Sequence, residues 1–197
     1  IDYVEIRIGD QIIDKHYGDW FHIWNELTLP IEKKALYYDM TGHNKKGVVS
    51  GSVTSQTCIL PFHFWFCKNV GNSLPMIALA NNDVTINIQL NQGYSTSSVE
   101  THRNSINSIS NLKLYADYIF LDREERRKFA QTSHEYLFEQ VKHTGDDTLL
   151  SNSTNEININ FNGFVKELVW ATIDQTNSTE NHAFNYIKNG QSNPRTF

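Results

Sequence analysis

This chain of 197 residues has few cysteines, no long apolar run and no excess of basic residues. The two cysteines, Cys58 and Cys67, would lie roughly 30 Å apart in one straight strand, at about 3.3 Å per residue, which excludes a disulfide bond between them. We expect two reduced, buried thiols. No apolar stretch approaches the roughly 18–20 residues that cross a bilayer, so we predict no membrane insertion. The net charge of −5 argues against a general nucleic-acid binder.

The usual motifs of catalysis are also missing. The segment Gly47-Val-Val-Ser50-Gly51 does not match a nucleophile elbow, and no phosphate-binding loop or dinucleotide fingerprint occurs. The adjacent carboxylates Glu124 and Glu125 stand among arginines in one short segment, where a solvated ion-pair face explains them better than glycosidase chemistry. We therefore expect a protein that is not an enzyme and that has no cofactor.

The eight histidines do not form a zinc motif. No His-Glu-x-x-His pair occurs, and neither cysteine has a Cys-x-x-Cys partner. His16 and His22 could meet near the first helix, with Asp14 or Asp19 as a further ligand, but packing or surface roles are favoured over a metal site. His63 is expected to be a half-exposed strand residue.

Alternation of apolar and polar side chains is the main positive signal, because a period of two is typical of a strand with one face in a core. Gly9-Asp10 is a typical tight turn and predicts a hairpin. The strands predicted in this way cover residues 4–8, 11–14, 57–67, 76–80, 84–90, 112–120, 134–141 (weakly patterned), 157–161 and 164–171.

Short helices are predicted between these strands. Asp19 is a candidate N-cap for a helix with apolar residues at helical spacing, and Pro30 suits the first turn of a second helix that ends near Gly42. Asp122 resembles the cap of a third, highly charged helix over residues 125–129. The polar segment 41–56 is predicted to be an exposed loop or a weak edge strand, and residues 91–110 are predicted to be a long loop.

Together these elements predict an all-β fold with short helical insertions. Strands dominate on both sides of a charged helical joint at about residues 122–132, and no βαβ rhythm is present. We therefore expect an antiparallel jelly-roll sandwich.

Several longer strings occur in a fixed order along residues 1–171. They include Val4-Glu-Ile-Arg-Ile-Gly-Asp-Gln-Ile-Ile-Asp14, Leu60-Pro-Phe-His-Phe-Trp-Phe-Cys-Lys-Asn69, Tyr115-Ala-Asp-Tyr-Ile-Phe-Leu-Asp122, His134-Glu-Tyr-Leu-Phe-Glu-Gln-Val141 and Val165-Lys-Glu-Leu-Val-Trp170. In these strings the chain resembles the major capsid protein of the nucleocytoplasmic large DNA viruses, a group that includes iridoviruses, phycodnaviruses and giant viruses.

The resemblance implies two consecutive eight-stranded jelly rolls. Residues 1–121 match the later strands of the first jelly roll, residues 122–132 the helical joint, and residues 133–197 the opening strands of an incomplete second one. Members of this family are more than twice as long, so we expect an internal piece of a longer protein. Alone, this piece would leave strand edges unpaired and an apolar face uncovered, and we expect it to be insoluble or unfolded.

The same resemblance implies a structural role in the virion, with no catalytic residues. Three chains would form a pseudo-hexagonal capsomer that tiles an icosahedral shell, assembled in the host cytoplasm. The expected partners are the chain itself, neighbouring capsomers and minor capsid proteins. An internal viral membrane would lie nearby, and no direct contact with nucleic acid is expected.

Three alternatives accompany this prediction. The first is a minor capsid or scaffold paralogue of the same fold. The second is a jelly-roll carbohydrate-binding module that stacks sugars on exposed aromatics such as Tyr94, Tyr37 or Tyr38. The third, a cupin-type enzyme, needs a cluster of histidine and glutamate on strands, and the sequence offers none.

The candidate site residues belong to the joint. We expect Asp122, Glu125, Arg126 and Arg127 to help fix the angle between the two jelly rolls. The basic cluster that also includes Arg123 and Lys128 is either a solvated helix face or a surface that docks onto an acidic neighbour. Asn152-Ser-Thr and Asn177-Ser-Thr fit the N-glycosylation pattern and are kept as less favoured modification sites.

Overall fold

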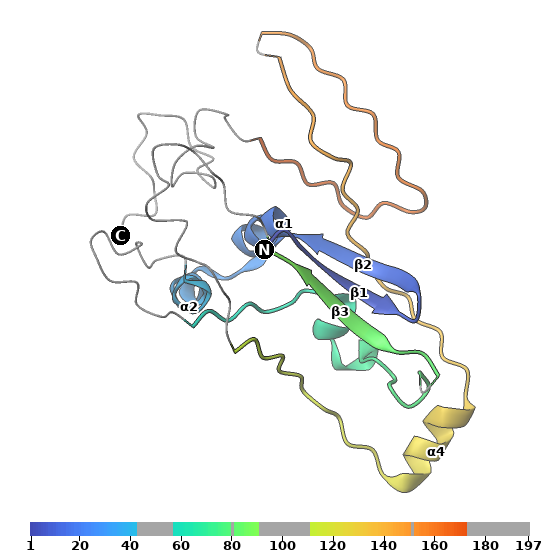
Figure 1. The fold of residues 1–197 in the computed structure, drawn as a ribbon. Coiled ribbons are helices and arrows are strands. Elements are labelled where there is room, and N and C mark those ends of the chain that lie inside the picture. The colour runs from blue at the N-terminus through green and yellow to red at the C-terminus, as the bar shows by residue number, and fades with distance from the viewer. Residues whose placement is uncertain (43–56, 80, 91–110, 151, 173–197) are drawn as a thin grey trace. The chain divides into compact units, whose positions relative to one another are not determined.

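The computed structural model describes residues 1–42, 57–79, 81–90, 111–150 and 152–172, and Figure 1 shows its elements. The chain divides into two compact units between Val141 and Lys142, and each is described by itself. The first unit holds all the helices and strands found in the described residues.

The first unit is built on a three-stranded antiparallel sheet in the order β2-β1-β3 (Figure 1). The strands are β1 (Tyr3–Ile8), β2 (Gln11–Tyr17) and β3 (Val84–Gln89), so the predicted hairpin and the predicted strand at 84–90 are confirmed. Gly9 begins the two-residue turn with φ +58°, a conformation that glycine adopts without steric cost. The β1–β2 register shifts between Ile6 and Arg7, as in a β-bulge.

Two helices follow the hairpin, as the sequence predicts. They are α1 (Gly18–Thr28) and α2 (Ile31–Thr41), and α2 ends at Gly42, whose φ of +80° is the left-handed conformation common after a helix. The predicted cap at Asp19 is wrong. Strand β2 continues directly into α1, so Tyr17 occupies the N-cap and Asp19 falls inside the first turn, where a negative charge still favours the helix dipole.

Residues 57–67 do not form the predicted strand. The described part of the chain offers no neighbouring strand for their backbone, and the amide of Cys67 instead donates to the carbonyl of Phe64 at 2.9 Å. This bond closes the short 3₁₀ helix η1 (Trp65–Cys67), which is followed by η2 (Val70–Asn72). The alternating aromatic side chains still pack on the core, so the pattern identified burial correctly and backbone pairing incorrectly.

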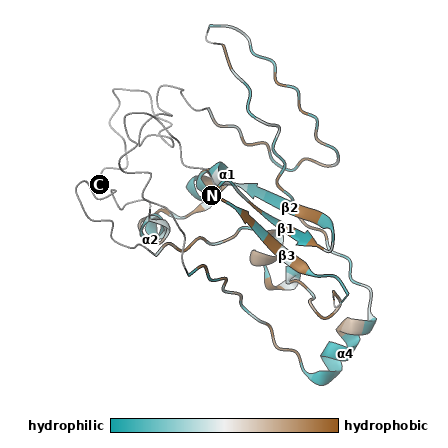
Figure 2. Cartoon of the chain, viewed as in Figure 1, coloured by the Kyte–Doolittle hydropathy of each residue, from teal (hydrophilic) through white to brown (hydrophobic). Residues whose placement is uncertain are grey.

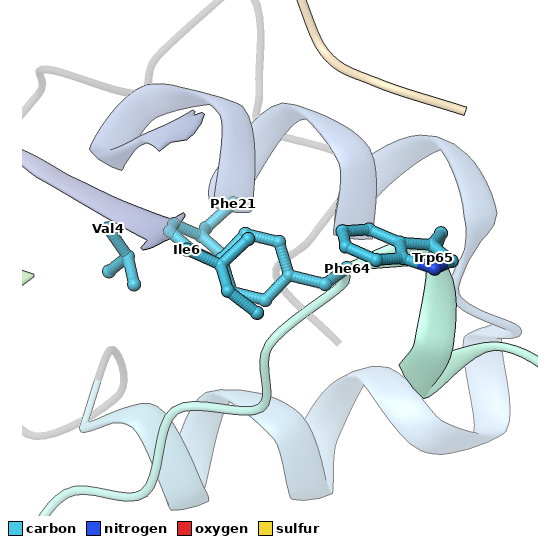
Figure 3. Close-up of a cluster of buried hydrophobic side chains, with 5 residues drawn as sticks. All are labelled: Val4, Ile6, Phe21, Phe64 and Trp65. Atoms are coloured by element: carbon cyan, nitrogen blue, oxygen red, sulfur yellow. The ribbon is translucent and has the colours of Figure 1, made fainter. Parts of the chain in front are cut away.

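The core of the first unit lies on one face of the sheet, where Val4 and Ile6 of β1 pack with Val84, Ile86 and Ile88 of β3. Figure 3 shows its five buried side chains, which come from β1, α1 and the start of η1: Val4, Ile6, Phe21, Phe64 and Trp65. Phe64 is completely buried, and Phe62 and Phe66 pack beside it. Aromatic side chains from a loop therefore cover this face of the sheet. In a complete β-sandwich, a second sheet covers the corresponding face.

The remaining predicted strands of the first unit are also wrong within the described residues. Residues 76–79 form turns, because the amides of Ala78 and Leu79 donate to the carbonyl of Pro75. Residues 112–120 and 134–141 carry no strand pairing, since the described sheet ends at β2 and β3. The charged helix is confirmed as α4 (Arg123–Gln131), which is largely hydrophilic (Figure 2).

The second unit, in its described residues 142–150 and 152–172, contains neither helix nor strand. The strands predicted at 157–161 and 164–171 are therefore not formed there, because no described segment pairs with them. Side chains such as Phe164 and Trp170 are exposed. The Asn155 side chain organises one turn: its Oδ1 accepts from the Leu150 amide at 2.9 Å and its Nδ2 donates to the Leu150 carbonyl at 2.9 Å.

The structure also bears on two further features, the state of the two cysteines and the length of the apolar helices. Cys58 and Cys67 are both free, as expected, but both are exposed rather than buried, because the segment that carries them is not a sheet strand. Within the described residues, no helix has the length and apolar character that a membrane crossing requires. Of the segment 41–56, Thr41 and Gly42 form the end of α2, and residues 43–56 lie outside the described residues, as does the predicted loop at 91–110.

Candidate functional site

A buried carboxylate–imidazole pair lies on β2. Asp14 and His16 are two residues apart on one strand, so both side chains point to the core face, opposite Ile6 and Val4 of β1. The Asp14 Oδ2 lies 3.0 Å from the His16 Nε2, and the two side chains are 1% and 2% exposed. The His16 ring stacks on Phe64 with centroids 4.6 Å apart. The pair is thus an integral part of the aromatic core.

The second oxygen of Asp14 links this core to a segment far along the chain. Asp14 Oδ1 accepts from the backbone amide of Lys15 at 2.9 Å and from that of Val141 at 3.1 Å. A carboxylate that accepts several charge-assisted hydrogen bonds can be held in a buried position. Asp14 therefore joins β2, the histidine of the core and the end of residues 134–141.

Residues 134–141, which we call the strap, cross the first unit as an anchored segment. The Phe138 ring stacks on Trp65 with centroids 4.7 Å apart. The Tyr136 hydroxyl donates to the Ser73 carbonyl at 3.3 Å, and the Gln140 side chain donates to the Ile13 carbonyl. The strap thus touches β2, η1 and the residue after η2, through polar contacts and one aromatic stack.

An exposed ion pair adds to this anchoring. Lys68 Nζ lies 3.1 Å from Glu139 Oε2, with side chains 42% and 50% exposed. The same ammonium lies 5.6 Å from the ring centroid of Trp24 on α1. Exposed pairs of this kind contribute little stability, so we assign the main anchoring to Phe138 and Asp14.

Helix α4 precedes the strap, and a side chain caps each of its ends. The Asp122 carboxylate accepts from the amide of Glu125 at 2.8 Å, which confirms the sequence prediction of an acidic cap. At the other end, His134 Nε2 lies 2.8 Å from the Phe129 carbonyl, and the two rings stack at 5.1 Å. A histidine donor satisfies a carbonyl that the helix leaves unpaired. Both ends of α4 are therefore fixed by side chains.

The basic residues of the joint all lie on the surface. Arg123, Arg126 and Arg127 are exposed and, with spacings of three and four residues, share one face of α4. Glu125 serves the helix through its backbone amide. No described contact gives the arginines a structural role within the first unit, which leaves the docking hypothesis open.

The sequence named His16, His22, Asp14 and Asp19 as a disfavoured metal-site alternative. In the described residues no group of three or more histidine, cysteine, aspartate or glutamate side chains is arranged to hold a metal ion. Asp14 pairs with His16 in the core, and Asp19 is exposed on α1. The sequence signal for the Asp14–His16 pair is their spacing of two residues on a strand, which places both side chains on one face, opposite Val4 and Ile6.

The remaining candidate residues do not form a common site. Asn152 lies on the surface with φ +58°, and Asn177 lies outside the described residues. Tyr37 and Tyr38 are half-buried, with their hydroxyls bonded to Asn25 and Glu26, so they do not offer the exposed sugar platform of the carbohydrate-binding alternative. Tyr94 lies outside the described residues.

Comparison with known protein families identifies the family of this chain. The family model described as "Major capsid protein N-terminus" matches residues 1–122, and the one described as "Large eukaryotic DNA virus major capsid protein" matches residues 125–196. The chain belongs to the major capsid protein family of large eukaryotic DNA viruses. Within this family, the strap lies in the part that matches the second model, and β2 lies in the part that matches the first.

Individual capsid proteins show the same relationship. The major capsid protein of Pyramimonas orientalis virus is 44% identical over 173 residues, which are 86% of this chain and 41% of that protein. The major capsid protein of Paramecium bursaria Chlorella virus 1 is 34% identical over 177 residues, which are 85% of this chain and 39% of that protein. The chain thus spans about two fifths of the length of these relatives.

A solved structure is also similar. It is the crystal structure of the VP54 protein of PBCV-1, fitted into a cryo-electron-microscopy reconstruction of the virophage Sputnik. The match is 34% identical, covers 71% of this chain and 33% of that chain, and has a TM-score of 0.48.

Proposed function

We propose that this chain is part of the structural subunit of an icosahedral capsid. Three such subunits form a pseudo-hexagonal capsomer, each contributing two consecutive jelly rolls, and capsomers tile the shell of a virion that is assembled in the host cytoplasm. The subunit contacts itself, neighbouring capsomers and minor capsid proteins, and it performs no catalysis. An internal viral membrane lies nearby without being penetrated.

One observation carries this proposal. Two capsid family models match consecutive stretches of the chain, in order, and together they leave only residues 123, 124 and 197 unmatched. The antiparallel hairpin, whose strand β1 turns Val4 and Ile6 to the core and Glu5 and Arg7 to the opposite face, is the kind of element from which jelly rolls are built. The rest of each sandwich comes from the longer polypeptide that the relatives contain.

Helix α4 has a defined place in the proposal. It begins at the boundary between the two matched regions, and it is capped by Asp122 at one end and His134 at the other. Such a helix is a stiff spacer, and the strap then fixes the next residues to β2 and η1. We infer that Asp122, Glu125 and the strap set the angle between the two jelly rolls, while Arg126 and Arg127 dock onto an acidic neighbour.

Assembly of the full-length protein tests this directly. Native mass spectrometry and negative-stain electron microscopy should show trimers with a pseudo-hexagonal outline. The double variant Arg126→Glu/Arg127→Glu should lower the trimer fraction severalfold. Lys113→Glu/Lys142→Glu, with the same change of charge outside the helix, should not. Normal trimers from the Arg126/Arg127 variant would refute the docking role, and monomers from the unchanged protein would refute the capsomer.

A minor capsid paralogue remains the second candidate, and one observation favours keeping it. The relatives include three different capsid proteins of a single virus, Acanthamoeba polyphaga mimivirus: "Capsid protein 1" and the probable capsid proteins 3 and 4. Several copies of one fold can therefore be encoded together, and abundance in the particle separates a major protein from a minor one.

A further inference from the structure

The Asn25 side chain of α1 lies at the centre of a buried polar cluster. Asn25 is 5% exposed. Its Nδ2 lies 2.6 Å from the Phe21 carbonyl oxygen, 2.8 Å from the Tyr37 hydroxyl of α2 and 3.1 Å from Nε2 of His63. One amide nitrogen thus connects α1, α2 and the segment that precedes η1.

The number of hydrogens fixes the roles in this cluster. An amide nitrogen carries two hydrogens and donates only. The Phe21 carbonyl can only accept, so the nitrogen of Asn25 rather than its oxygen faces that carbonyl. The second hydrogen is then shared between Tyr37 and His63. His63 can take part only if its Nε2 has a free lone pair, which requires a neutral ring protonated on Nδ1.

The surroundings of His63 favour the same neutral form. Burial lowers the pKa of His63, and the positive charges of His16 on β2 and Lys68 after η1 lower it further. In the described contacts, α1 meets His63 through the Phe21 ring and the Asn25 amide, and neither is a carboxylate, while Tyr37 of α2 reaches the cluster through Asn25. A proton on Nε2 would point at the amino group of Asn25, so donor would face donor.

We propose that His63 is an acid-sensitive latch, which in its neutral form holds α1 to the segment before η1 and which releases α1 on protonation. The latch differs from the neighbouring His16, whose Nε2 faces the carboxylate of Asp14. Protonation of His63 therefore breaks its hydrogen bond to Asn25, whereas His16 keeps the carboxylate of Asp14 as its partner. The expected result is local loosening of α1 at the Asn25 contact, with the sheet left in place.

The sign of the pH dependence follows from linkage. Because the pKa of His63 is lower in the folded protein than the ordinary value of 6.5, the unfolded or loosened state binds more protons below that value. The stabilisation is fully present above about pH 6.5, and it is lost progressively as the pH falls toward the lowered folded-state pKa.

Hydrogen–deuterium exchange of the full-length protein tests the latch. Exchange is compared at pH 7.5 and pH 5.0 after correction for the chemical exchange rate. In the unchanged protein, protection of α1 peptides should fall several-fold at the lower pH. His63→Gln, whose side-chain oxygen accepts from Asn25 at both pH values, should change less than twofold. His134→Gln, which removes a histidine from the strap, should keep the full response.

A second variant keeps the test decisive if His63→Gln does not fold. Asn25→Asp places a carboxylate against His63, so a protonated ring gains a partner and α1 should be at least as protected at pH 5.0 as at pH 7.5. The latch is overturned if α1 of the unchanged protein shows no acid response, if His63→Gln keeps that response, or if Asn25→Asp still loses protection in acid.

Discussion

The carboxylate of Asp14 lies 3.0 Å from the imidazole of His16, both side chains are almost fully buried, and the His16 ring contacts Phe21 and Phe64. The other oxygen of Asp14 receives the amide of Val141, the last residue of the first unit. A single side chain therefore joins the hairpin core to the strap. Both ends of this link lie within the first unit, so it fixes the end of the strap on the hairpin core.

Removing the Asp14 carboxylate should destabilise this core strongly. Asp14→Ala leaves His16 without its carboxylate partner and removes the side-chain acceptor of the Lys15 and Val141 amides. Loss of one member of a buried pair costs about 3–5 kcal/mol. Urea unfolding of the full-length protein, followed by tryptophan fluorescence, should show a clear fall in the midpoint.

A neighbouring carboxylate supplies the control for Asp14. Asp10 is exposed in the turn of the same hairpin, so Asp10→Ala should change stability by less than about 0.5 kcal/mol. Equal midpoints for the two variants would show that the Asp14 contacts do not support the fold.

Phe138 should contribute more to the strap than the residue beside it. Its ring stacks on Trp65 and is 37% exposed, whereas Leu137 is 98% exposed. Phe138→Ala should lower stability by about 2 kcal/mol through lost apolar burial and the lost aromatic pair, and it should increase hydrogen exchange in residues 134–141.

Leu137→Ala is the matched control in the strap, because it also truncates an apolar side chain. It should leave both stability and exchange nearly unchanged. If Leu137→Ala and Phe138→Ala increased exchange equally, the strap would not be anchored at Trp65.

Asp122 should stabilise the start of α4. Its side chain accepts from the Glu125 amide at 2.8 Å, and replacement of such a cap by alanine costs about 1 kcal/mol of helix stability. Asp122→Ala should therefore raise the exchange rate of amides in the first turn of α4 several-fold. Asp122→Ser should restore most of the protection, and Asp117→Ala, which removes an exposed aspartate just before the helix, should have no effect there.

Local sequence signals predicted the elements whose partners are close in the chain. The β1–β2 hairpin needs only Gly9-Asp10 and two alternating strands, and α1 needs only its helical spacing of apolar residues. Strand β3 pairs with β1 across more than 70 residues, yet its alternation of isoleucine with polar residues was sufficient. Alternation and helical spacing of apolar residues arise whenever one face of a strand or helix is buried, whichever part of the protein covers that face.

The same signal was misleading where burial does not require a strand. Phe62, Phe64 and Phe66 alternate as in a strand, but Trp65 between them is also buried, and η1 turns the backbone so that both sets reach the core. Residues 112–120 and 164–171 show strand patterns without strand pairing, because pairing is a property of two segments and the described chain supplies only one.

The candidate site was predictable in part. The cap at Asp122 follows from its own four residues, whereas the links from Asp14 to Val141 and from Ile13 to Gln140 join residues 127 apart in the sequence. No pattern within one segment reports such contacts. The pairing of Asp14 with His16 could have been read from their common face, and only the burial of that face was missing.

The abundance of this protein in purified virus particles decides whether it builds the shell. Quantitative mass spectrometry with isotope-labelled peptides from the α1 and α4 regions gives copies per particle, and the copy number of the genome provides the scale. We expect it to be the most abundant protein of the particle, at a copy number divisible by three that matches the capsomers counted by electron microscopy. A few copies per particle, or none, would contradict a major capsid role.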